Sequence, residues 1–124
     1  IGFGIPVSAQ GGDPVAERVN LMRQNGMLMR GAMRATGADA TNAAQTLSSN
    51  FEALTSLFDD PATPGDTLPS AWENRDGFLA LFAEAKERAD AALAAAQAGD
   101  GDAYVAALRA VNQTCSSCHA DFRR

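Results

Sequence analysis

The chain has 124 residues, of which 46% are hydrophobic and 6% aromatic, and its formal net charge is −5. This length suffices for one domain with a buried core, and its many alanines favour packed helices over a sheet. The acidic balance argues against a nucleic-acid-binding surface, which needs clustered basic residues. No apolar run approaches the roughly 20 residues that span a bilayer.

The first residues suggest export. Residues 1–9 are small and apolar and end in Val-Ser-Ala, which resembles the end of a secretory signal with its cleavage site. The alternative is an ordinary tail that contains glycine and proline. Both interpretations are compatible with an exported protein that has an N-terminal tail at residues 1–12 and one domain at residues 13–124.

Apolar residues spaced by three and four predict two helices in the first half of the chain. Asp13 is a suitable N-cap and Pro14 suits the first turn, so the first helix should run to about Thr36. The second helix should begin within residues 39–41 and end near Asp59. The predicted apolar stripes are Val15, Val19, Met22, Gly26, Met29 and Met33 in the first helix, and Leu47, Phe51, Leu54 and Phe58 in the second.

A long connection and a third helix follow. Residues 60–69 contain three prolines and a glycine and show no periodicity, so they should form a loop. Ser70 and Glu73 have the spacing of a capping box, in which each side chain bonds to the other residue's backbone N–H. The third helix should therefore begin at Ser70 and continue to about Ala98, with Gly99 as its C-cap.

The last helix should begin at Asp100 or Asp102. Its predicted inward stripe consists of Tyr104, Leu108, Val111, Cys115, Cys118 and Phe122. Four helices joined by two short turns and one longer loop predict an all-α fold, an antiparallel four-helix bundle. Because Cys115 and Cys118 belong to this inward stripe, any group attached to them should lie inside the bundle.

The motif with the clearest chemistry occupies residues 115–119, which read Cys-Ser-Ser-Cys-His and contain both cysteines and the only histidine. This is the attachment signature of a c-type haem, in which two thiols form thioethers with the vinyl groups and the imidazole ligates iron. A redox-active dithiol would need a βαβ setting, and a zinc site usually needs four ligands. A disulfide within the motif would close only a very small loop. The motif predicts one covalently attached haem c, held by Cys115 and Cys118, with His119 as iron ligand.

With this motif at the end of a fourth helix, the chain resembles the cytochrome c′ family, the class II c-type cytochromes. The resemblance covers about residues 13–124. The family pattern Cys-x-x-Cys-His-x-x-aromatic-Arg is completed here by Phe122 and Arg123. Residues 68–72 are similar to the family's Pro-x-x-Trp entry into its third helix, and residues 98–100 to its usual turn into the fourth. The resemblance implies a periplasmic haem protein.

The resemblance also concerns the other face of the haem. Arg18 and Met22 match the positions where the family has a basic residue near a haem propionate and a side chain on the distal face. In gas-binding members that side chain is unbonded and the iron is five-coordinate, whereas in low-spin relatives a methionine ligates the iron. The run Leu-Met-Arg-Gln-Asn-Gly at residues 21–26 is more similar to the low-spin branch. Core packing is the alternative role for such a methionine.

Arg123 stands four residues after His119, on the same helical face. There its charge should shield the imidazole edge, complement the dipole at the helix C-terminus, or do both. Arg18 is either a propionate partner or a solvated side chain.

Together these features predict a periplasmic electron carrier with a low-spin haem ligated by His119 and Met22. It should meet its redox partner proteins through small, transient interfaces. The alternative is a five-coordinate protein that binds nitric oxide or carbon monoxide, and a third hypothesis is a helical binding module with a dithiol and no haem. No nucleophile–base pair or pair of carboxylates stands out, so we expect that the protein is not an enzyme. The resemblance further implies that the first two helices can form a homodimer seam.

Overall fold

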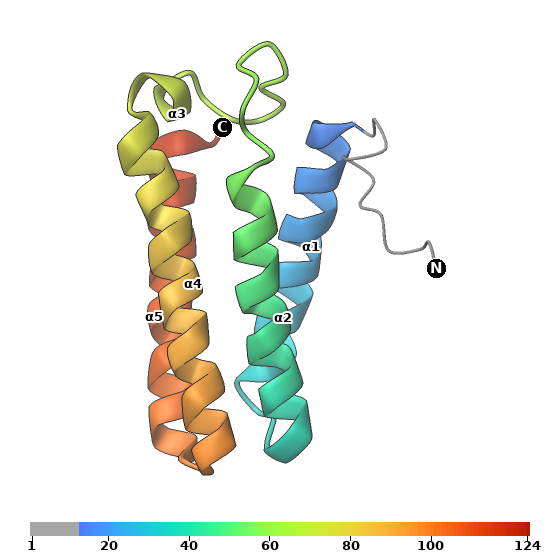
Figure 1. Cartoon of the computed structure of the whole chain (residues 1–124), viewed down its shortest axis with the longest axis vertical. Coiled ribbons are helices and arrows are strands. Elements are labelled where there is room, and N and C mark those ends of the chain that lie inside the picture. Colours follow the sequence, from blue (N-terminus) through green and yellow to red (C-terminus); the bar gives the residue numbers. More distant parts are fainter. Residues whose placement is uncertain (1–12) are drawn as a thin grey trace.

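The computed structural model describes residues 13–124, and within them the chain forms five helices. Their bounds are α1 Pro14–Ala32, α2 Gly37–Thr55, α3 Ser70–Glu73, α4 Arg75–Ala98 and α5 Gly101–Phe122. The four long helices run alternately up and down, which confirms the predicted all-α antiparallel four-helix bundle (Figure 1). The predicted signal remnant at residues 1–9 lies outside the described residues. Within residues 13–124, none of the helices has the length and the apolar character that a membrane span requires.

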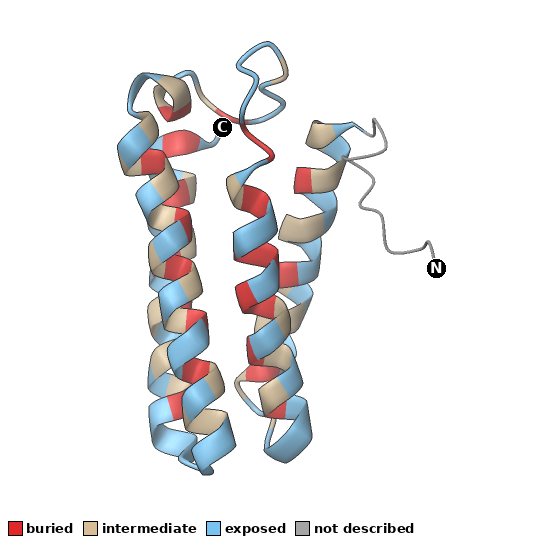
Figure 2. Ribbon diagram, viewed as in Figure 1, coloured by how far each residue is buried: buried red, intermediate tan, exposed pale blue. Residues whose placement is uncertain are grey.

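The hydrophobic core lies mainly between α2, α4 and α5, whose buried residues face one another (Figure 2). α2 packs most extensively on α4, and α4 packs on α5, whereas α1 packs on α2 over a smaller area and meets α5 only weakly. At the end of the bundle near the long loop, four phenylalanine rings form a cluster with centroid distances of 4.9 to 5.5 Å; they are Phe58, Phe78, Phe82 and Phe122. Burying each such ring stabilises the fold by about 1.5–3 kcal/mol.

α1 is attached to the bundle by hydrogen bonds at three levels, one heptad apart. Its buried residues are Arg18, Asn25 and Ala32. Arg18 donates to carbonyl groups of the long loop. The Asn25 side-chain oxygen accepts from the Asn50 amide of α2 at 2.8 Å, and the Ala32 carbonyl accepts from the Tyr104 hydroxyl of α5 at 2.8 Å. Polar contacts therefore supplement apolar packing along this helix.

The predicted apolar stripe of α1 is correct only in part: Met22, Met29 and Met33 pack against the core, but the fully buried residues of this helix are others. Val19 is 44% exposed, although the stripe placed it in a packed seam. Because Arg18 and Asn25 find partners on the loop and on α2, α1 turns these two residues toward the bundle. The stripe that begins with Val15 and Val19 consequently lies beside the seam.

α2 ends earlier than predicted, at Thr55 and not near Asp59. The reason lies in the Phe58 carbonyl group, which accepts hydrogen bonds from the side chains of Trp72 and Arg75, both at 2.8 Å. The Phe58 carbonyl therefore has hydrogen-bond donors from these two side chains, and it does not need the backbone N–H group that a further helical turn would supply.

α1 also ends earlier than predicted, at Ala32 and not at Thr36. The backbone N–H of Ala35 bonds to the Ala32 carbonyl at 3.1 Å, a spacing of three residues that tightens the end of the helix. α2 begins at once with Gly37, whose φ of 56° favours glycine.

The predicted capping box at Ser70 and Glu73 is wrong. The Ser70 hydroxyl donates to the carbonyl of Asp121 at 3.1 Å, and Ser70 makes no capping hydrogen bond. The predicted third helix divides at Asn74, whose φ of −118° and ψ of 60° are not helical. The Asn74 side chain then caps α4 by accepting from the Gly77 N–H at 3.3 Å.

The turn between α4 and α5 agrees with the prediction. Gly99 has a φ of 74° and serves as the C-cap of α4, where the left-handed conformation favours glycine. The Asp100 side chain caps α5 by accepting from the Ala103 N–H at 3.1 Å.

The capping difference can be tested by substitution. Replacing Asn74 by alanine removes the cap of α4, so Asn74→Ala should lower the free energy of unfolding by about 1 kcal/mol. Glu73→Ala is the matched control, and it should change stability by less than ~0.5 kcal/mol because Glu73 is exposed. Urea unfolding of the purified, haem-loaded variants measures both free energies of unfolding. If Glu73→Ala lowered the free energy of unfolding more than Asn74→Ala, the result would support the predicted capping box instead.

Candidate functional site

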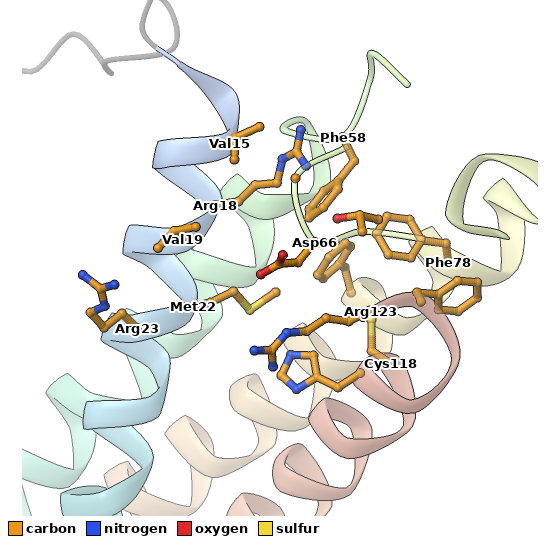
Figure 3. Close-up of a pocket in the computed structure, with 15 residues that line it drawn as sticks. Val15, Arg18, Val19, Met22, Arg23, Phe58, Asp66, Phe78, Cys118 and Arg123 are labelled. Atoms are coloured by element: carbon orange, nitrogen blue, oxygen red, sulfur yellow. The ribbon is translucent and has the colours of Figure 1, made fainter. Parts of the chain in front are cut away.

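A cavity of about 520 Å³ opens between α1, α4, α5 and the long loop (Figure 3). Its volume falls within the roughly 300–1,000 Å³ typical of ligand and cofactor sites. A smaller cavity of about 20 Å³ shares part of its lining. Five of the residues predicted for the haem site line the larger cavity, namely Arg18, Met22, Cys118, His119 and Arg123, and Cys115 lines the smaller one. The fold therefore brings all six predicted residues to one place.

The two cysteines lie one turn apart on α5, and both thiols are free. Cys118 is buried and Cys115 is partly buried. Burial is the main cause that raises the pKa of Cys118 to about 11, and it raises the pKa of Cys115 as well. Both thiols are therefore protonated at neutral pH, whereas a redox-active dithiol needs a lowered pKa. Within residues 13–124 no group of three or more His, Cys, Asp or Glu side chains suits a metal ion, so a zinc site finds no support.

His119 projects from the same end of α5 into both cavities and is partly buried. Burial lowers the pKa of its imidazole, and the positive charge of Arg123 lowers it further. The neutral imidazole keeps a nitrogen lone pair, which is the form that ligates a metal.

Met22 reaches the cavities from α1. Its side chain extends from α1 toward Cys118 and Arg123 (Figure 3). It lines both cavities together with His119, so that the side chain of Met22 comes from α1 and that of His119 from α5. Of the other methionines, Met29 packs against the core and Met27 is 56% exposed.

Arg18 lines the cavity, but its guanidinium group is occupied by the loop. Its Nε donates to the Leu57 carbonyl at 2.9 Å, one terminal nitrogen donates to the Pro64 carbonyl at 3.2 Å, and the other donates to the Thr63 carbonyl. The guanidinium carbon also lies 4.4 Å from the centre of the Phe58 ring. Burial lowers the pKa of Arg18, and the charge of Asp13 partly offsets this effect. Pairing of Arg18 with a propionate stays a prediction.

Arg123 lies at the C-terminus, where the chain pairs with the long loop. Arg123 and Thr67 form an antiparallel bridge, flanked by a bond from the Leu68 N–H to the Phe122 carbonyl at 2.8 Å. A second bond joins the Arg124 N–H to the carbonyl of Asp66 at 2.9 Å. These backbone contacts place the exposed Arg123 side chain at the cavity, close enough to His119 to lower its pKa.

The sequence interpretation missed the loop residues of the site. Gly65, Asp66 and Thr67 line the cavity, as does Arg23 of α1. The loop has no periodicity that would indicate a buried face, and its prolines and glycine signalled only a turn. The pairing with the C-terminus joins residues that are far apart in the chain, so no local pattern marks it.

The lining of the cavity fits a haem. Its walls contain the rings of Phe58, Phe78, Phe82 and Phe122. Its charged residues are three arginines and one aspartate, a net charge of +2 that matches two ionised propionates, although the chain as a whole carries −5. Two neutral thiols and a neutral imidazole complete the donor set that a c-type haem needs.

Comparisons with known proteins agree with this geometry. The family model described as Cytochrome C′ matches residues 15–123. The cytochrome c′ of Rhodopseudomonas palustris (strain ATCC BAA-98 / CGA009) is 29% identical over 133 residues, covering 99% of this chain and 88% of that protein. The solved cytochrome c′ of Rhodopseudomonas palustris has a TM-score of 0.77 at 28% identity, covering 90% of this chain and 96% of that one.

A further solved cytochrome c′ has a TM-score of 0.81 at 22% identity, covering 90% of this chain and 95% of that one, and this likeness concerns the fold alone. Because the family model covers nearly the whole bundle, including the cysteines and the histidine, the chain belongs to the cytochrome c′ family and binds covalently attached haem c.

Proposed function

We propose that this protein is a periplasmic electron carrier whose haem c is attached to Cys115 and Cys118 and ligated by His119 and Met22. The observation that carries the proposal is that Met22 of α1 and His119 of α5 line the same two cavities, together with Cys118. The bound group supplies one-electron chemistry at its iron.

The residues of α5 have separate tasks in this proposal. Cys115 and Cys118 hold the group covalently from one helix face, and His119 presents a neutral imidazole beside them. Burial and the charge of Arg123 keep that imidazole unprotonated. The guanidinium of Arg123 also adds positive charge near the iron site, which favours the reduced state.

Met22 acts from α1 in this proposal. A thioether there fills the sixth position, limits access by exogenous ligands and raises the reduction potential. The apolar side chains of Val15, Val19 and Phe58 line the same cavity and reduce the access of water.

A second candidate function is gas binding by a five-coordinate haem, with nitric oxide or carbon monoxide as ligand. The comparisons favour this candidate, because the matching family model and the similar proteins carry the name cytochrome c′. In it, Met22 would pack beside the distal face without a bond to iron, which would leave the sixth position open to a diatomic ligand.

The proposal includes transient redox partners, because a carrier must release each partner after the electron has moved. It also includes a homodimer formed through α1 and α2. The side chain of Met27, which is 56% exposed and does not line the cavity, supports a contact through α1.

The variant Met22→Ala separates the two candidate functions. If Met22 ligates iron, the wild-type ferrous protein should be low-spin with sharp, split visible bands and no response to carbon monoxide. Met22→Ala should become high-spin and bind the gas. Optical spectra of both oxidation states, with and without carbon monoxide, measure this change.

Met29→Ala is the matched control, since Met29 lies on the same helix and packs against the core but lines neither cavity. It should keep the wild-type spectrum. A wild-type spectrum that is already high-spin and shifts with carbon monoxide would contradict the electron carrier and support the gas-binding function.

The attachment residues are tested by mass spectrometry of the denatured protein. The double variant Cys115→Ala/Cys118→Ala should carry no covalent haem, and each single variant should retain it through the remaining thiol. Ser116→Ala is the control, since Ser116 is exposed between the two cysteines, and it should retain the full haem mass. Covalent haem in the double variant would contradict the assignment.

A further inference from the structure

The loop of residues 57–69, called here the strap, is fastened at two places. On one side it pairs with the C-terminus through the bridge between Thr67 and Arg123. On the other side its carbonyl groups accept hydrogen bonds from Arg18 of α1. The strap therefore connects the helix that carries Met22 to the end of the helix that carries His119.

In the first half of α1, Arg18 is the one fully buried residue, and its side chain makes hydrogen bonds to the strap. It is only 4% exposed, whereas Val15, Val19 and Met22 face the cavity. The next buried residue of α1 is Asn25, almost two turns further along. Met22, which itself packs against the core, therefore lies between two hydrogen-bonded attachments of α1, at Arg18 one turn before it and at Asn25.

The strap also touches α1 directly. Gly65 has a φ of 55°, and a Cβ atom built there would lie 3.0 Å from Cγ1 of Val15 and 3.9 Å from a terminal nitrogen of Arg18. A side chain at this position would be strained by the backbone conformation and would push against Val15. The glycine thus permits the close approach in which Arg18 reaches the strap carbonyls.

We propose that Arg18 is a positioning residue whose guanidinium fork fastens α1 to the strap and so holds Met22 in place on the distal wall. The effect on Met22 rests on the proposed ligation of iron, but the attachment of α1 to the strap does not. The rigid, planar guanidinium group of arginine can donate to the three strap carbonyls at once. A lysine ammonium is a compact charge on a flexible stem and lacks this fixed arrangement of donors. The charge of Arg18 alone would serve a propionate, but the fork is needed for the strap.

This difference defines the decisive variant, Arg18→Lys, which keeps the charge and removes the fork. Arg18→Leu removes both, and Arg30→Leu is the control for charge on the same helix, because Arg30 is exposed and does not line the cavity. Gly65→Ala disturbs the same contact from the strap side while leaving Arg18 unchanged. All four are studied as haem-loaded protein.

Hydrogen exchange measures the attachment, whatever the ligand of the iron. In Arg18→Lys and Arg18→Leu, amides of the strap and of the first half of α1 should exchange about tenfold faster or more, since one hydrogen bond from a charged group is worth roughly this factor. Gly65→Ala should change in the same direction, and Arg30→Leu should match the wild type. Arg18→Lys with wild-type exchange would overturn the proposal and leave only a role for the charge.

The position of Met22 is measured by the far-red absorption band of a methionine–ferric iron bond and by binding of carbon monoxide to the ferrous protein. Arg18→Lys should weaken the band and increase the fraction that binds the gas. A wild-type band that persists unchanged in Arg18→Lys would overturn the positioning of Met22 by Arg18. A wild-type protein without the band would instead refute ligation by Met22, and the exchange rates would still decide whether Arg18 fastens the strap.

Discussion

The separation of α1 from α5 governs the haem site, and hydrogen bonds help to set it. Arg18, Asn25 and the Ala32 carbonyl attach α1 to the strap, to α2 and to α5 at three levels along its length. Between them α1 meets α5 only weakly, and the space left at one end of the bundle is the cavity lined by Met22 and His119. A continuous apolar seam between these helices would have closed that space.

Burial has opposite effects on the pKa values of the thiols and of the imidazole, yet it favours the neutral form of both. It raises the pKa of Cys118 to about 11 and lowers the pKa of His119, since a charged group loses hydration in either case. Neutral thiols and a neutral imidazole suit permanent attachment and metal ligation, and they do not suit a reactive dithiol. The same desolvation makes the fork of Arg18 depend on its carbonyl partners, because an unpaired guanidinium would be costly to bury.

Most of the fold was predictable because local signals agree with the tertiary structure. Asp13 and Pro14 begin α1, Gly99 ends α4, and the stripe from Tyr104 to Phe122 faces inward. The errors occur where distant groups compete with local signals. The Ser70 hydroxyl bonds to the Asp121 carbonyl instead of capping a helix, and α2 ends where Trp72 and Arg75 satisfy the Phe58 carbonyl.

The attachment of haem can be predicted from the amino-acid sequence, because both thiols and the imidazole lie within residues 115–119 of one helix. The bundle can also be predicted, from the spacing of apolar residues. Only the tertiary structure shows which groups Arg18 binds and which residues line the cavity. The hydrogen-bond partners of Arg18 are Leu57, Thr63 and Pro64, which lie 39, 45 and 46 residues away in the chain, and contacts over such separations leave no trace in local periodicity.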